Sequence, residues 1–191
     1  MIRLFLQRHP PVDLRYKGIC YGAADVELAP GWESLADTVI DGWSEGLPDR
    51  VIHSDVSRTR DPAEYAGRRW NIPVGSDPRL REVSLGAWEL RSWDAIYAET
   101  GSTMDRILAE PDSFAPPDGE TLFVLRDRVM AAITDLARQA PVANWSSLLI
   151  VTHGGPIAAI RGTLAGQPAK DWPALIPACG EIVSLTVPCE Q

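Results

Sequence analysis

Two of the three histidines in this 191-residue chain directly follow apolar runs of strand length. His9 comes after residues 2–7 and Arg8, and His153 comes after residues 147–152. The carboxyl ends of parallel strands meet at one edge of an open sheet, where the ligands of such sheets gather. A neutral imidazole there can act as a nucleophile or carry a proton. One histidine in such a place is more often a structural hydrogen-bonding residue, but two predict a shared reactive site.

Positive charge converges on the same predicted edge. Arg8 precedes His9, and Arg58 follows the apolar run at residues 50–54. A guanidinium group binds phosphate or carboxylate through paired hydrogen bonds, and a buried one needs such a partner. The alternative is an internal ion pair with Asp25 or Asp55, which could account for one arginine but not readily for both. The pair therefore predicts an anion site.

Small residues after His153 support this prediction. Gly154 and Gly155 allow a close backbone approach, and Pro156 suits the first turn of a helix. The amide groups at a helix N-terminus attract anions. Gly154 is therefore expected to line the anion site.

Strand-like and helix-like segments alternate along the chain. Trp, Leu, Val and Ile recur at helical spacing in residues 32–43 and 122–136, and Asp61 followed by Pro62 resembles a helix start. The expected strands are residues 2–7, 50–54, 147–152 and 181–187. This order predicts an α/β fold of three layers, with helices on both faces of a mostly parallel sheet. We expect one domain over residues 1–191, with residues 85–117 inserted as a short lid.

Composition excludes several classes of partner. The chain has 18 Lys and Arg against 26 Asp and Glu, a formal charge of -8, which disfavours binding to nucleic acid or to an anionic membrane. Three cysteines without metal-binding or disulfide spacing predict a cytoplasmic protein with no metal and no other cofactor. The expected partner is a small molecule, and a homodimer is left open.

Five segments, in chain order, resemble the motifs of the histidine phosphatase superfamily, also called the phosphoglycerate-mutase-like family. They are LQRHPPV, HSDVSRTRDPA, LREVSLGAWE, PPDGET and LLIVTHGGPIAAI. The resemblance spans nearly the whole chain and implies the same three-layer fold. RHP followed by GICYGAADVEL, with the short lid, is most similar to the alpha-ribazole phosphatase branch, which acts in assembly of the cobalamin nucleotide loop.

The resemblance also implies a role for each matching residue. His9 matches the nucleophile that becomes a phosphohistidine, while Arg8, Arg58 and His153 match the phosphate pocket. Glu82 matches the proton donor, which would protonate the leaving alkoxide and later take a proton from water. Cations around the phosphoryl group would offset its charge, so no metal is required. The implied activity is hydrolysis of a small phosphomonoester, with alpha-ribazole 5′-phosphate as the candidate substrate.

Three positions depart from the family pattern. Pro10 replaces a glycine after the nucleophile, Asp55 stands where proline is usual, and Leu90 replaces the glycine of a WEG motif. Asp55 could place negative charge near the phosphate pocket. Glu82 has the alternative of a surface ion pair with Arg79 or Arg81.

Other polar and aromatic residues have plainer expected roles. His53 is expected to make a structural contact, and Glu120 to cap the helix that follows it. Trp88, Trp93 and Tyr97 in the lid could stack on an aromatic base or simply pack.

Three other functions compete with a phosphatase. A phosphoglycerate mutase shares the phosphohistidine but must shield it from water, for which the lid is short. A phosphoester-binding module would need the arginines but neither His9 nor Glu82. Residues 42–46 fit the GxSxG pattern of serine esterases, but Ser44 ends a predicted helix instead of following a strand, so we reject that match.

Overall fold

The central sheet has five strands, four of which are parallel. A computed structural model describes residues 1–189 and places the strands in the order β4-β3-β6-β1-β7, with β7 antiparallel to β1. The strands are β1 (Ile2–Arg8), β3 (Arg50–His53), β4 (Val74–Ser76), β6 (Ser147–Thr152) and β7 (Ile182–Val187). The predicted, mostly parallel α/β sheet is thus confirmed. β4 was not predicted, because its sequence Val-Gly-Ser carries almost no strand signal.

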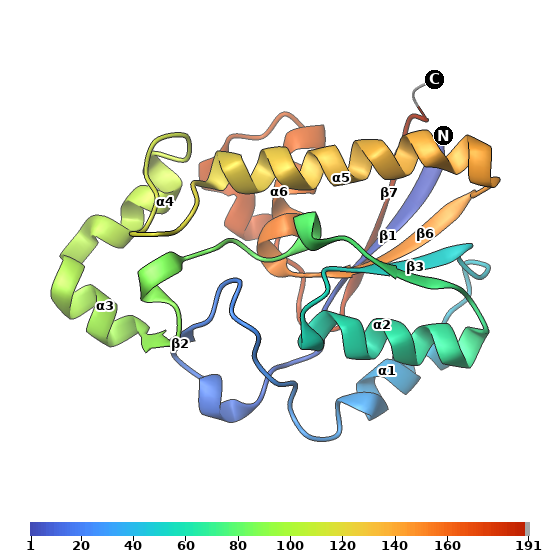
Figure 1. Cartoon of the computed structure of the whole chain (residues 1–191), viewed down its shortest axis with the longest axis horizontal. Helices are drawn as coiled ribbons and strands as arrows, with labels where there is room; N and C mark the ends of the chain where they lie inside the picture. Colours follow the sequence, from blue (N-terminus) through green and yellow to red (C-terminus); the bar gives the residue numbers. More distant parts are fainter. Residues whose placement is uncertain (190–191) are drawn as a thin grey trace.

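Helices cover both faces of the sheet, as Figure 1 shows. The helices α1 (Trp32–Asp41) and α2 (Ser57–Trp70) lie on one face, and α5 (Leu122–Ala143) and α6 (Gly154–Leu164) on the other. Alternate residues of β1 point to opposite faces. Leu4 and Leu6 join the larger core with α5 and α6, whereas Phe5 packs with Trp43 and Trp70. Apolar residues on both sides therefore fix the register of β1.

Helix α2 begins earlier than the sequence indicated. We expected its N-cap at Asp61, but the helix starts at Ser57 and Pro62 lies inside it. The cap comes from a distant loop, because the Asp25 carboxylate accepts hydrogen bonds from the Ser57 N–H at 2.9 Å and the Ser57 hydroxyl at 2.6 Å. Arg58 consequently lies in the first turn of the helix instead of in the preceding loop.

Residues 85–117, the predicted lid, have more regular structure than the sequence indicated. Strand β5 (Arg91–Ser92) pairs with β2 (Ile19–Cys20), followed by α3 (Trp93–Thr100) and α4 (Arg106–Ala109). A separate small core of Cys20, Leu85, Trp88 and Ile96 holds the lid to the loop after β1. Helices α3 and α4 project from one end of the molecule in Figure 1.

Short 3₁₀ helices occupy several connections. They are Leu14–Tyr16, Pro78–Leu80, Gly86–Trp88, Gly101–Asp105 and Ala169–Leu175. The turn at Pro78–Leu80 and the turn at Gly86–Trp88 bracket the irregular segment that contains Glu82.

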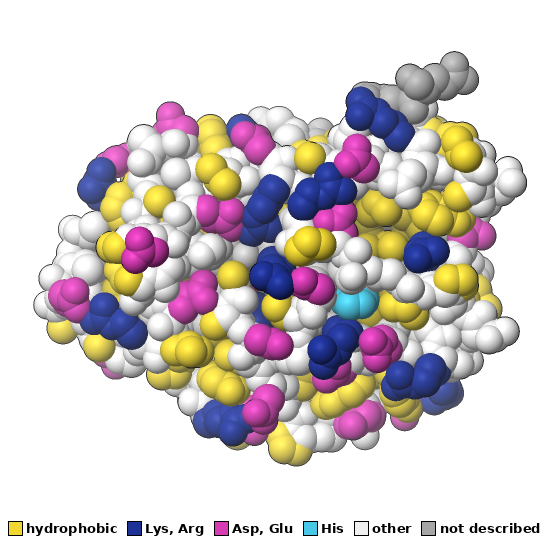
Figure 2. All heavy atoms as spheres, viewed as in Figure 1, with side chains coloured by type: hydrophobic (Ala, Val, Ile, Leu, Met, Phe, Trp, Pro, Cys, Tyr) yellow, Lys and Arg dark blue, Asp and Glu magenta, His cyan; other side chains and the backbone are white. Residues whose placement is uncertain are grey.

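Acidic and basic side chains are interspersed over the face of the molecule in Figure 2. Many charged side chains of the protein form exposed ion pairs, such as Arg3 with Glu45 and Arg106 with Glu110, which contribute about 0 to 1 kcal/mol each. Within residues 1–189, no helix combines the length and the apolar character needed to cross a lipid bilayer.

Leu90 adopts the left-handed backbone conformation that its family glycine would favour. Its φ is 62°, and its side chain is 60% exposed, so packing offsets little of the strain. Most residues with a Cβ avoid this region because the Cβ approaches the following carbonyl oxygen. Leu90 therefore stores backbone strain at the base of the lid.

We predict that Leu90→Gly is more stable than Leu90→Ala by about 1 kcal/mol. The two variants lose the same exposed side chain, but only alanine keeps the strained Cβ. Urea denaturation would measure both free energies of unfolding. Alanine equal to or better than glycine, as at ordinary positions, would show that the backbone is unstrained.

Candidate active site

Parallel pairing of β1 with β6 places His9 beside His153. Arg8 lies opposite Thr152 in the register, and the His9 N–H donates to the Thr152 carbonyl at 2.9 Å. The ring centroids of the two histidines are 5.3 Å apart. Both rings are buried, so the site lies in the molecule at the carboxyl edge of the sheet.

The hydrogen bond of His9 defines its tautomer. Nδ1 lies 2.6 Å from the Pro10 carbonyl oxygen, and because a carbonyl only accepts, Nδ1 carries the proton. Burial and the nearby Arg58 and Arg8 guanidinium groups lower the pKa of His9 to about 3. The imidazole is therefore neutral at physiological pH, with its lone pair on Nε2. Pro10, which departs from the family glycine, supplies the same kind of main-chain acceptor.

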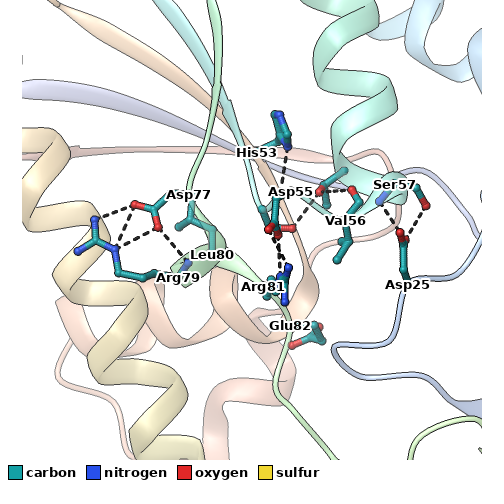
Figure 3. A network of polar contacts seen from close by, with 12 residues as sticks. Asp25, His53, Asp55, Val56, Ser57, Asp77, Arg79, Leu80, Arg81 and Glu82 are labelled. Carbon is teal, nitrogen blue, oxygen red and sulfur yellow. Dashed lines mark hydrogen bonds and ion pairs between the residues drawn. The ribbon is translucent and has the colours of Figure 1, made fainter.

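Arg58 is a fully buried cation with no carboxylate partner among residues 1–189. Its Nη1 and Nη2 donate to the Ala24 and Gly22 carbonyls at 2.6 Å each, and its Nε donates to His153 Nδ1 at 3.2 Å. The alternative ion pair with Asp25 or Asp55 does not form. Asp25 caps α2, and Asp55 pairs with Arg81, as Figure 3 shows.

His153 is fixed by protein groups on both sides of its ring. Since Nδ1 accepts from Arg58, Nε2 carries the proton and donates to the Ser54 hydroxyl at 2.6 Å. Ser54 is linked in turn to Thr59 at 2.8 Å, and Thr59 donates to the Val56 carbonyl at 3.0 Å. Burial, Arg58 and His9 lower the pKa of His153 well below its usual value. Direct contact of this ring with phosphate would require Ser54 to release it.

Arg8 offers a donor that no protein group satisfies. Its Nη1 donates to the Pro177 carbonyl at 2.9 Å, but its buried Nε has no hydrogen-bond partner within residues 1–189. A buried unpaired donor is costly, and a bound anion would remove that cost. Gly154 borders this guanidinium, since a Cβ there would lie 3.6 Å from Arg8 Nε. The predicted neighbours Arg8 and Gly154 are thus brought together.

The Glu82 carboxylate lies at the N-terminus of α6. It accepts hydrogen bonds from the Val83 N–H at 2.9 Å and from the Gly155 N–H at 3.1 Å. A Cβ at residue 155 would come within 2.2 Å of Glu82, which explains the second glycine of the motif. One amide that we expected to face a bound anion is therefore taken by Glu82.

The surface ion pair considered for Glu82 does not form. Arg79 pairs with Asp77 and Arg81 pairs with Asp55, as Figure 3 shows, and Arg79 also pairs with Asp135, so neither arginine neutralises Glu82.

Asp55, the second departure from the family pattern, has its charge neutralised. Arg81 donates to both carboxylate oxygens of Asp55 at 2.7 Å. The Asp55 backbone is left-handed, with φ 68°. The Asp55 N–H donates to His53 Nδ1 at 3.0 Å, so His53 makes the structural contact that was expected. Burial lowers the pKa of His53, which keeps Nδ1 available as an acceptor.

Sequence reasoning missed several residues that support the site. Glu89 accepts hydrogen bonds from the Ala23 N–H at 3.0 Å and the Leu85 N–H at 2.9 Å, and so holds the loop that binds Arg58. Its signal was present in the LREVSLGAWE segment. Tyr21 stacks under Arg58, with 5.4 Å between the guanidinium carbon and the ring centroid, but nothing in the sequence marks this contact.

The three aromatic residues of the predicted lid differ in their surroundings. Trp88 is buried in the lid core, and Tyr97 is 59% exposed. Trp93 lines a cavity of about 300 Å³ together with Tyr16 and Tyr21. Trp93 is thus the lid aromatic that shares a cavity with the Tyr21 ring beneath Arg58.

The expected cap of α5 by Glu120 is wrong. The Thr121 side chain caps the helix by accepting from the Val124 N–H at 3.1 Å. Glu120 points away from this turn, accepting from the Ser84 N–H at 2.9 Å and pairing with Arg128.

Over residues 1–189, no three His, Cys, Asp or Glu side chains are grouped so that they could hold a metal ion.

Residues 4–188 match the model of the histidine phosphatase superfamily, branch 1. The chain belongs to this superfamily. The match covers every residue of the site described above and confirms the family resemblance of the sequence.

Relatives in the superfamily carry different activities. The chain is 28% identical to a glucosyl-3-phosphoglycerate phosphatase of Mycolicibacterium vanbaalenii, over 91% of this chain and 78% of the relative. It is 29% identical to a probable phosphoglycerate mutase of Photorhabdus laumondii, over 88% of this chain and 77% of the relative. The alpha-ribazole phosphatase of Shigella flexneri has a similar structure, with a TM-score of 0.83 and 23% identity, over 97% of this chain and 91% of that chain. A phosphatase or mutase activity on a small phosphorylated molecule is thus supported, and the alpha-ribazole likeness shows the fold.

The buried neutral state of His9 predicts a pH dependence of stability. Below pH 6.5 the unfolded chain binds a proton at His9 that the native protein, with a pKa of about 3, does not bind. The stability present above pH 6.5 should therefore be lost as the pH falls toward 3. We predict that His9→Asn reduces the slope of unfolding free energy against pH by about 1.4 kcal/mol per pH unit in this window.

Urea denaturation at several pH values between 7 and 4, in phosphate-free buffer, measures this slope. Parallel curves for the two proteins would mean that His9 titrates normally in the native state.

Proposed function

We propose that this protein is a phosphomonoesterase that transfers the phosphoryl group of a small metabolite to His9 and then to water. One observation carries the proposal: a neutral His9 with a free Nε2 lies among the Arg8 and Arg58 guanidinium groups. This arrangement combines a nucleophile with the positive charge that a phosphate dianion needs.

In the first step, the Nε2 lone pair forms a bond to phosphorus while the bond from phosphorus to the ester oxygen breaks. The ring becomes a cation, and its Nδ1–H continues to donate to the Pro10 carbonyl. Protonated Glu82 gives its proton to the departing alkoxide, which leaves as an alcohol. The spacing of the site supports this role, because Glu82 is held next to the helix that His153 begins.

In the second step, the Glu82 carboxylate takes a proton from water as the water oxygen bonds to phosphorus. The bond between Nε2 and phosphorus breaks, and inorganic phosphate is released. His9 returns to its neutral form and Glu82 to its acid form, so protons and charge balance over the cycle.

Arg8, Arg58, His153 and Gly154 form the proposed phosphate pocket. The unpaired Nε of Arg8 is the donor best placed to gain a phosphate oxygen as partner. Arg58 supplies a fixed positive charge, since its side chain is already held by carbonyl oxygens, and His153 would donate to the phosphate once Ser54 releases its Nε2. In our assignment Gly154 leaves the space beside Arg8 that the phosphate needs.

Two alternatives remain distinct from hydrolysis. The relative named as a probable phosphoglycerate mutase favours a phosphotransferase, which would need a bisphosphoglycerate primer to phosphorylate His9. A phosphoester-binding module would hold ligand without turnover. Release of inorganic phosphate without a primer supports the phosphatase over both.

Alpha-ribazole 5′-phosphate is the candidate substrate, which would connect the protein to cobalamin biosynthesis. The cavity lined by Tyr16, Tyr21 and Trp93 supports an aromatic organic half, because Tyr21 also contacts Arg58. We take residues 1–191 to act as one unit, with the lid at 85–117 covering the substrate. Free thiols at all three cysteines support a cytoplasmic location.

We predict that the wild-type protein acquires an acid-labile, base-stable phosphoryl group from its substrate, and that His9→Ala does not. Turnover should fall to background in His9→Ala, because no other buried nucleophile faces the arginines in our assignment. Rapid quenching with radiolabelled phosphoester measures the adduct, and circular dichroism checks the fold. Turnover of His9→Ala at the wild-type rate would exclude a covalent mechanism on this residue.

We predict that Glu82→Gln slows phosphorylation of His9 by an alkyl phosphate about a hundredfold or more, and by nitrophenyl phosphate far less. An alkoxide is a poor leaving group and depends on the proton, whereas nitrophenolate leaves without it. Single-turnover measurements isolate this step from the attack of water. Equal losses on both esters would assign Glu82 to ordering the pocket instead of donating a proton.

A further inference from the structure

The segment that carries Glu82 has no helix or strand of its own. Residues 81–85 run between two 3₁₀ turns, so other groups must fix their backbone. The guanidinium group of Arg128, on α5, takes this role. Its Nη1 donates to the carbonyls of Arg79 at 2.7 Å and Arg81 at 2.8 Å, and its Nη2 donates to the Glu82 carbonyl at 2.9 Å.

Glu120 completes the same arrangement from the other side of Glu82. Its carboxylate accepts from Arg128 Nε at 3.0 Å and from Nη2, so all five donors of the guanidinium are used. The same carboxylate accepts from the Ser84 N–H at 2.9 Å, and the Glu120 N–H donates to the Ser84 carbonyl at 2.9 Å. The Arg128–Glu120 pair therefore fixes the backbone before and after Glu82 by hydrogen bonds.

The pair is well shielded compared with the other ion pair on this segment. The side chains of Arg128 and Glu120 are 22% and 14% exposed, whereas those of Arg81 and Asp55 are 46% and 29% exposed. Exposed pairs are screened by water and contribute little. The Asp55–Arg81 pair in Figure 3 thus supports the segment from the α2 side, but Arg128 provides the larger number of contacts to it.

We propose that Arg128 is a positioning residue for proton transfer by Glu82, an inference that rests on the proposed function. It touches neither the phosphate pocket nor the leaving group, but it fixes three carbonyls at and before the acid. Proton donation requires hydrogen-bond distance to the leaving oxygen, and small displacements of the donor reduce the rate steeply. Arg128 thereby connects helix α5 and the base of the lid to the chemistry.

The test compares Arg128→Met with Arg79→Met. Arg79 is the matched control because it links the same region to α5 through Asp77 and Asp135, but its side chain donates to no group of residues 81–84. Single-turnover phosphorylation of His9 is followed with an alkyl phosphate and with nitrophenyl phosphate. We expect Arg128→Met to lose about tenfold or more on the alkyl ester and much less on the nitrophenyl ester. Arg79→Met should change both rates alike.

Further variants separate failure of this inference from failure of the proposed function. The double variant with Glu82→Gln and Arg128→Met should be no slower on the alkyl ester than Glu82→Gln alone, because both changes remove the same proton transfer. Arg128→Lys keeps the charge but not the fork, and it should show the same ester-dependent loss if Arg128→Met does not fold. The positioning role is overturned if Glu82→Gln loses rate mainly on the alkyl ester while both Arg128 variants lose the same rate on the two esters, or none. The absence of that dependence in Glu82→Gln itself overturns the general-acid assignment.

Discussion

A buried guanidinium group that pairs with no carboxylate in the described part of the chain is the constraint around which this structure is organised. Arg58 is fully buried, and its donors reach only two carbonyls and a neutral imidazole. Carbonyl dipoles reduce the cost of burying the charge, and the carboxylates of Glu82, Asp25 and Glu89 stabilise it without a direct hydrogen bond. Burial and then the field of Arg58 lower the pKa values of both neighbouring histidines, and the positive charge keeps the site prepared for an anion. The loop at residues 22–24 exists in its observed form because Arg58 and Glu89 hold it.

The parts of the fold that the sequence predicted are those fixed by local patterns. The apolar runs that became β1 and β6 were long and buried on both faces, so their strands and the meeting of His9 and His153 followed from pattern and topology. The family motifs added Glu82, whose placement no periodicity could indicate. β4 was missed because three residues with a central glycine carry too little pattern.

What the sequence could not provide were contacts between loops far apart in the chain. The start of α2 was misplaced because its cap, Asp25, lies 32 residues upstream. Glu120 was expected to cap α5 because the local spacing fitted a cap. Its carboxylate instead accepts hydrogen bonds from Arg128 and from the Ser84 N–H. The unpaired Nε of Arg8 is likewise a property of the folded interior. For α2 and for Glu120, a long-range partner outweighed the local preference.

The hydrogen bond between His9 Nδ1 and the Pro10 carbonyl also has a regiochemical consequence. A phosphohistidine exists as two regioisomers, according to which ring nitrogen bears the phosphoryl group. The Pro10 carbonyl accepts the proton of His9 Nδ1, so Nδ1 has no lone pair with which to attack phosphorus. Because this acceptor is the main chain of the next residue, no rotation of another side chain can remove it. Within the proposed mechanism only the Nε2 isomer can form. The chain thus selects one of two chemically similar adducts through a single main-chain oxygen, before any substrate binds.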